Sequence, residues 1–194
     1  DDYYLGNNTT ILNGVRRKEE HMADHRAAHN HARYVSQFIV GYLTGNPIKI
    51  DHSDDKAREY IRNIERSNEL DALHSELTLD CSVYGRAYEL LYRNEDDETK
   101  VVMLSPLETF VIYDETVEQK PIAGVRYRKS FKNGETKFYI DVYTSDYEYN
   151  YESSTLTADQ FRLIDEGEHY FEGVPIIEYQ NNRFRQGDYE DVLD

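Results

Sequence analysis

The sequence predicts an α+β fold, in which about three N-terminal helices are followed by an antiparallel β meander. Two observations support this prediction. Up to Tyr84, apolar residues recur at three- and four-residue steps, which is the period of an amphipathic helix. From Arg86 onward, apolar and polar residues alternate in short runs separated by turn residues, which is typical of antiparallel strands.

The first helix is expected from His29 to Thr44, where apolar residues form one stripe with helical spacing. The sequence Gly45-Asn46-Pro47 is expected to end it. Glycine accepts the left-handed conformation that commonly follows a helix, and proline cannot continue one. The stripe consists of Ala32, Val35, Phe38, Ile39, Tyr42 and Leu43.

Two further helices are expected before the strands begin. Asp54 or Ser53 can cap the second helix, which extends to Arg66. Asn68 can cap the third, which ends at Gly85. The inner face of the second helix is expected to contain Ala57, Tyr60, Ile61 and Ile64. The inner positions of the third are Leu70, Leu73, Leu77, Cys81 and Tyr84.

The strands are expected to form hairpins. Asn133-Gly134, between the fourth and fifth strands, is the strongest short hairpin signal in the chain. Residues 147–151 alternate strictly and are expected to form an edge strand with a tyrosine face. The expected strands cover residues 87–92, 101–104, 109–113, 122–128, 137–143, 147–151, 161–164 and 175–179.

Two regions are expected along the chain. Residues 1–30 show little hydrophobic periodicity and are expected to form an arm or long loop, with a short helix around Glu19 to Ala28. Residues 31–194 are expected to form one α+β domain. The last nine residues resemble a loop followed by the first turn of a helix, which suggests a piece of a longer protein.

The composition excludes several classes of protein. The chain has 194 residues, a net charge of −16 at pH 7 and a mean hydropathy of −0.82. No run approaches the roughly 18 apolar residues of a membrane span. The single cysteine rules out an internal disulfide framework and fits a reducing compartment. The overall charge disfavours a basic protein that clamps nucleic-acid phosphates.

The negative charge is concentrated toward the C-terminus. Residues 1–50 carry a net charge of +1, whereas residues 146–194 contain thirteen acidic and three basic residues, a net charge of −10. One interpretation is a solvated surface that keeps the chain soluble. The other is an acidic wall that DNA passes without sticking.

The sequence lacks the common motifs of catalysis. It contains no Gly-rich phosphate loop ending in Gly-Lys-Ser/Thr, no Gly-x-Ser-x-Gly elbow and no Gly-x-Gly-x-x-Gly turn. Cys81 lies among the core positions of a predicted helix, so it is a poor candidate nucleophile. We therefore expect no catalytic residue, no cofactor and no enzymatic activity.

One group of histidines points toward metal binding. His21, His25 and His29 follow one another at four-residue steps. On a helix, two of them would share a face and could bind Zn²⁺ or Ni²⁺. No cysteine is placed to complete the coordination sphere, so we expect no metal site and a solvated polar arm. A metal-binding or metal-dependent protein that uses this cluster is the alternative function.

Tyrosine is unusually abundant, with 18 residues against seven phenylalanines and no tryptophan. Tyrosine offers a large contact area and tolerates water, as protein interfaces require. The simpler explanation is that half-buried strands favour tyrosine. A tyrosine-rich interaction module of a host is a further alternative function. The candidate interface residues are Tyr3, Tyr4, Tyr147, Tyr149 and Tyr151.

Five stretches stand out, in this order: Tyr3–Gly6, Phe38–Ile48, Cys81–Glu89, Ser105–Asp114 and Gly173–Asn182. The most specific motifs in them are Gly-Tyr-Leu-x-Gly-Asn-Pro and, much later, Val-Pro-Ile-Ile-Glu-Tyr-x-Asn-Asn. Together, the stretches resemble a known family, the portal proteins of long-tailed (siphovirus-type) phages and prophages of Gram-positive bacteria.

The resemblance implies a structural protein of the virion, not an enzyme. Portal proteins form a ring, typically of twelve subunits, at one capsid vertex, and DNA is packaged and ejected through the ring without sequence-specific binding. The resemblance also implies no membrane association and a place in the host cytoplasm during assembly. The implied partners are further copies of the chain, terminase, the major capsid and scaffold proteins, and the head–tail adaptor or connector.

The resemblance also implies which part of the ring the chain forms. It matches the peripheral wing of the N-terminal portion. The stem, clip and crown regions would lie outside residues 1–194.

Overall fold

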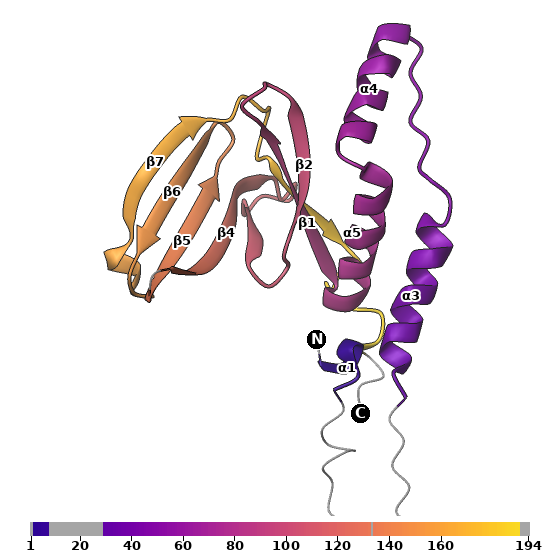
Figure 1. Ribbon diagram of the computed structural model, residues 1–194, viewed down its shortest axis with the longest axis horizontal. Coiled ribbons are helices and arrows are strands. Elements are labelled where there is room, and N and C mark those ends of the chain that lie inside the picture. The colour runs from indigo at the N-terminus through magenta and orange to yellow at the C-terminus, as the bar shows by residue number, and fades with distance from the viewer. Residues whose placement is uncertain (1, 8–28, 133, 191–194) are drawn as a thin grey trace, which may run out of the picture.

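The computed structural model describes residues 2–7, 29–132 and 134–190. In this part of the chain, helices come first and antiparallel strands follow, so the predicted α+β class is confirmed (Figure 1). The predicted helix at residues 19–28 lies outside the described residues. The helices are α1 (Asp2–Leu5), α3 (His31–Thr44), α4 (Asp55–Ser67) and α5 (Leu70–Tyr84).

The strands form two sheets, each antiparallel throughout. The three-stranded sheet has the order β2-β1-β8 and consists of β1 (Arg86–Arg93), β2 (Thr99–Leu104) and β8 (Ile176–Gln180). Five of the eight expected strands form a continuous meander in the second sheet, which consists of β3 (Thr109–Tyr113), β4 (Pro121–Lys132), β5 (Glu135–Tyr143), β6 (Tyr147–Ser153) and β7 (Arg162–Glu168). The return of β8 to pair with β1 was not predicted, because nothing local in the sequence signals it.

Helix α5 joins the helices to the three-stranded sheet. Leu73 and Leu77 on α5 pack with Ala87 at the start of β1 and form one buried cluster. Helix α3 packs on the other side of α5, and α4 extends from the N-terminal end of α5 (Figure 1). Tyr60 on α4 is 58% exposed, so its predicted place on an inner face is wrong. Helix α4 has no buried residue, because little of it lies beside another element.

The helix ends follow the predicted signals in part. The Asp54 carboxylate accepts the N–H groups of Lys56 and Ala57 and caps α4 as expected. Asn68 does not cap α5. Its side chain donates to the Thr99 carbonyl and accepts from the Val101 N–H, so it ties the junction of α4 and α5 to β2.

The two glycines that follow α3 and α5 differ in backbone conformation. Gly85 has a φ of 76°, which is the predicted left-handed cap of α5, and a side chain here would also collide with the Arg185 carbonyl. Gly45 has a φ of −64°, so its predicted left-handed conformation is wrong. The chain instead leaves α3 by a continued right-handed turn before Pro47.

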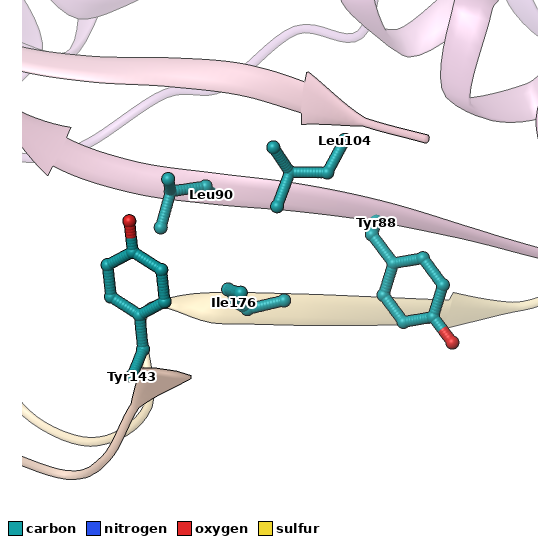
Figure 2. Packing of buried hydrophobic residues seen from close by; sticks show 5 residues of the cluster. All are labelled: Tyr88, Leu90, Leu104, Tyr143 and Ile176. Atoms are coloured by element: carbon teal, nitrogen blue, oxygen red, sulfur yellow. The ribbon is translucent and has the colours of Figure 1, made fainter. Parts of the chain in front are cut away.

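The two sheets meet in one buried apolar cluster (Figure 2). Ile176 on β8 is 2% exposed and lies against Gly124 on β4. A Cβ atom on Gly124 would come within 2.6 Å of the Ile176 Cβ, so only glycine permits this approach. The cluster consists of Tyr88, Leu90, Leu104, Tyr143 and Ile176.

A buried carboxylate beside this cluster links the sheets a second time. The Glu178 side chain on β8 is 2% exposed. It accepts hydrogen bonds from Tyr113 on β3, Tyr88 on β1 and Arg185 in the C-terminal segment. Burial, and then the hydrogen bond to Glu178, raises the pKa of Tyr113 to about 12, which keeps the phenol a donor. Glu178 thus connects three separate parts of the chain.

Replacing Gly124 with alanine should separate the sheets. The added methyl group must displace Ile176, which we expect to lower the free energy of unfolding by about 1–3 kcal/mol. Chemical denaturation measures this change. Gly167→Ala, on β7 of the same sheet with open space around the new methyl group, is the control. Equal stability of the two variants would contradict the tight contact.

Acid should weaken the Glu178 junction. Burial tends to raise the pKa of this carboxyl, but hydrogen bonds from Arg185 and Tyr113 outweigh burial and hold the pKa below its ordinary 4.5. The charged form therefore stabilises the fold above about pH 4.5, and this stability is lost as the pH falls through the folded-state pKa.

We expect Glu178→Gln to lower the free energy of unfolding by about 2 kcal/mol at pH 7, with a smaller loss on acidification than in the parent chain. Thermal unfolding between pH 7 and pH 3 measures both effects. Glu172→Gln, an exposed carboxylate with no hydrogen bond among the described residues, is the control. If Glu178→Gln had the same stability as this control at every pH, the charged Glu178 would contribute nothing to the stability of the fold.

Candidate functional site

The tyrosines of β6 share one face of the five-stranded sheet. Tyr147, Tyr149 and Tyr151 are alternate residues of this strand. The rings of Tyr147 and Tyr149 lie 6.3 Å apart, and the Tyr147 hydroxyl donates to Glu168. The prediction that residues 147–151 form an edge strand is wrong, because β7 pairs along the open side of β6.

The tyrosine face continues across the whole sheet. In the observed register, one row of neighbouring residues crosses the sheet. It runs from Tyr149 on β6 through Val142 on β5 and Val125 on β4 to Phe110 on β3. We call this surface the aromatic face. Its apolar members include Phe110, Ile112, Ala123, Val125, Tyr127, Phe138, Ile140, Val142, Tyr147, Tyr149, Tyr151 and Leu163.

None of these twelve side chains is buried. Those near the outer strands are widely exposed, as Phe110 at 46% and Leu163 at 47% show. The central ones are half-buried, and the rings of Tyr127 and Phe138 stack at 6.3 Å. A contiguous apolar surface of this kind typically marks an interaction site.

The opposite face of the same sheet is covered or polar. Gly124 and Tyr143 on that face pack against the three-stranded sheet. Farther along, Arg128 forms an ion pair of 3.1 Å with Asp141 and lies over the Tyr139 ring. The core contact therefore uses a face with charged residues, and the described residues leave the more apolar face uncovered.

Helix α3 carries a second exposed apolar surface. Tyr34, Phe38 and Tyr42 follow one another at four-residue steps, are 70%, 65% and 79% exposed, and form a row that we call the α3 ridge. Phe38 and Tyr42, with the 59% exposed Leu43, were predicted to lie on the inner stripe, and this prediction is wrong.

A polar residue explains this error. Ser36 is fully buried, and its hydroxyl accepts a hydrogen bond from Ser82 on α5. The helix–helix contact is built on these two small residues, and a hydrophobic pattern does not reveal such a contact. A row of three aromatic residues at helical spacing could have indicated the ridge.

The N-terminal tyrosines lie elsewhere. The Tyr3 side chain is outside the described residues. Tyr4 is half-buried in α1, and its carbonyl accepts a hydrogen bond of 2.7 Å from the Asn30 side chain, which helps to hold α1 on α3. The structure thus brings together Tyr147, Tyr149 and Tyr151 but not Tyr4. The interface role of all five residues stays a prediction.

The described residues contain little that suggests catalysis or metal binding. A groove of about 930 Å³ lies between residues 47–51 and the helices α4 and α5, and its lining mixes basic residues with carboxylates and contains no serine, threonine, cysteine or histidine. His21 and His25 lie outside the described residues, and His29 is exposed. Among the residues described, no three histidine, cysteine or acidic side chains are grouped to hold a metal ion.

Every helix in the described part of the chain is too short or too polar to span a membrane.

Comparison with known proteins gave one family. The family described as "Phage portal protein, SPP1 Gp6-like" matches residues 1–194. A search of curated proteins gave no match.

Cys81 should be a slow nucleophile in the folded chain. Burial, and then the negative charges of Asp80 and Asp188, raises the pKa of its thiol from 9.0 to about 11. At pH 8 we therefore expect alkylation by iodoacetamide to be about a hundredfold slower than in the urea-unfolded chain. Mass spectrometry over time measures the rates. An exposed cysteine in the variant Cys81→Ser/Val117→Cys should react at the unfolded rate; equally fast reaction of Cys81 would contradict its placement.

Proposed function

The chain belongs to the SPP1 Gp6-like phage portal protein family, and we propose on this basis that it forms part of the ring at the capsid vertex through which DNA is packaged and ejected. The predicted resemblance to portal proteins is therefore confirmed at the level of the family. The family is structural, belongs to the virion capsid, and assembles as an oligomeric ring with other phage head proteins. The siphovirus type and a Gram-positive host stay predictions.

The match over all 194 residues carries this proposal. Within the ring, residues 31–194 serve as the peripheral wing, and the ring is the docking point for terminase and the head–tail connector. The chain performs no catalysis of its own. The two uncovered apolar surfaces support this role, because a subunit of a ring must contact its neighbours through surfaces that are exposed in the single chain.

The acidic surface also suits a protein near moving DNA. Asp165, Glu166 and Glu168 on the outer strand β7 are all exposed. They belong to the segment with a net charge of −10. Such a surface repels phosphate, so DNA can pass without being held.

Immunogold electron microscopy of phage particles tests the proposal directly. An antiserum raised against the chain should label assembled heads at one vertex, because a portal ring occupies a single vertex. An antiserum against the major capsid protein, which should label the whole shell, is the control. Label spread over the shell, confined to the tail tip, or absent from particles that the control antiserum labels would overturn the proposal.

A further inference from the structure

We propose that the α3 ridge of one copy packs on the aromatic face of the next copy, and that this contact links neighbouring subunits. The inference rests on the proposed ring and goes beyond it, because it names the two surfaces that meet. Each is apolar, and no other element in the described part of a single chain covers it. Together they would form a helix-on-sheet layer, which is a common way to bury both kinds of surface.

The two surfaces cannot meet within one copy. The aromatic face is the side of the five-stranded sheet that points away from Gly124 and Ile176, and therefore away from the three-stranded sheet. Helix α3 lies beyond α5, on the far side of that three-stranded sheet (Figure 1). Contact between them must therefore join different copies. Because the two surfaces differ, the contact can repeat head-to-tail from copy to copy, and such a contact forms a ring when the rotation between copies closes.

The dimensions of the two surfaces agree. Helix α3 has 14 residues and is therefore about 21 Å long. The outer strands of a five-stranded sheet lie about 19 Å apart. The helix can thus lie over the whole sheet. Gly41, which lies between Phe38 and Tyr42 on the exposed side, has open space around it and lets the sheet approach the helix backbone.

The area of the ridge indicates a real but weak contact. Three aromatic side chains of about 200 Å² each, exposed as observed, present roughly 400 Å² of apolar surface. This is about half of the 800 Å² that each partner buries in a standard interface. We therefore expect two isolated copies to associate weakly and the closed ring to strengthen the contact.

The charges also favour this pairing. Copies with a net charge of −16 repel one another, so they should meet where charge is low. Among the helices that the structure describes, α3 is the one without a carboxylate, and it carries Arg33 in an exposed position. The aromatic face is bordered on β7 by the exposed carboxylates Glu166 and Glu168. The rim of the aromatic face is thus negatively charged, whereas helix α3 carries no negatively charged side chain.

Cross-linking between two different variants tests the pairing. In a Cys81→Ser background, Gln37→Cys places one thiol beside the ridge, and Glu166→Cys places one at the rim of the aromatic face. A short bis-maleimide is added to each variant alone and to their mixture. We expect the mixture to give about tenfold more covalent dimer than either variant alone, because only the mixture places the two thiols at one contact.

The other outcomes are informative. Dimer from Glu166→Cys alone would indicate that two sheets meet, dimer from Gln37→Cys alone that two helices meet, and either result would overturn the pairing. A mixture of Gln37→Cys with Val117→Cys, a fully exposed loop position, sets the background. A yield from the test mixture no higher than this background would also overturn it.

A second variant tests the ridge itself. Phe38→Asp in the Gln37→Cys chain should reduce the cross-link to background. Leu156→Asp, at a position 66% exposed like Phe38 at 65%, should not. Unchanged cross-linking by Phe38→Asp would overturn the inference, and circular dichroism checks that both variants are folded. Loss of this contact while the antiserum still labels one vertex refutes the pairing alone; cross-linking without vertex labelling refutes the portal function alone.

Discussion

The close approach of the two sheets at Gly124 and Ile176 is the constraint on which the rest of the structure depends. It decides which face of the five-stranded sheet is buried. Because the missing side chain of Gly124 admits Ile176, β4 and β8 come together, and Tyr143 completes the cluster between them. Glu178, two residues after Ile176, then receives hydrogen bonds from both sheets and from the C-terminal segment. One end of β8 therefore supplies both the apolar and the polar link.

Within residues 2–7, 29–132 and 134–190, this arrangement leaves the most apolar side of the sheet without a partner. A protein that acted alone would bury such a face, since uncovered aromatic surface promotes association. A subunit of a ring has the opposite requirement, because its stability is completed by its neighbours. The family of the chain, its uncovered aromatic face and the exposed row on α3 therefore agree with one another. In the proposed ring, the acidic strand β7 borders the contact and keeps the surrounding surface soluble.

Much of the local structure could be predicted because its causes lie within a few residues. Asp54 caps α4 through adjacent N–H groups, and Gly85 ends α5 in the left-handed conformation. The alternation of apolar and polar residues predicted each strand of the described chain to within a few residues of its observed bounds. The failures have distant causes. Asn68 was predicted to cap α5, but its side chain bonds the Ile64 carbonyl of α4 and two backbone groups of β2, more than thirty residues away. Residues 147–151 were predicted to form an edge strand, and only the pairing with β7 showed otherwise.

The sequence by itself determined the α+β class, the order of the elements and the alternation that puts Tyr147, Tyr149 and Tyr151 on one side of a strand. It did so because periodicity and turn chemistry act locally. Only the tertiary structure decided whether that side is inward or outward, since the two faces of a strand are equivalent until another layer covers one. The same holds for α3, where the buried pair Ser36 and Ser82 turned the aromatic row toward solvent. Which surface is free to bind a neighbour is therefore a property of packing, and on α3 the hydrophobic pattern alone had placed Phe38 and Tyr42 in the core.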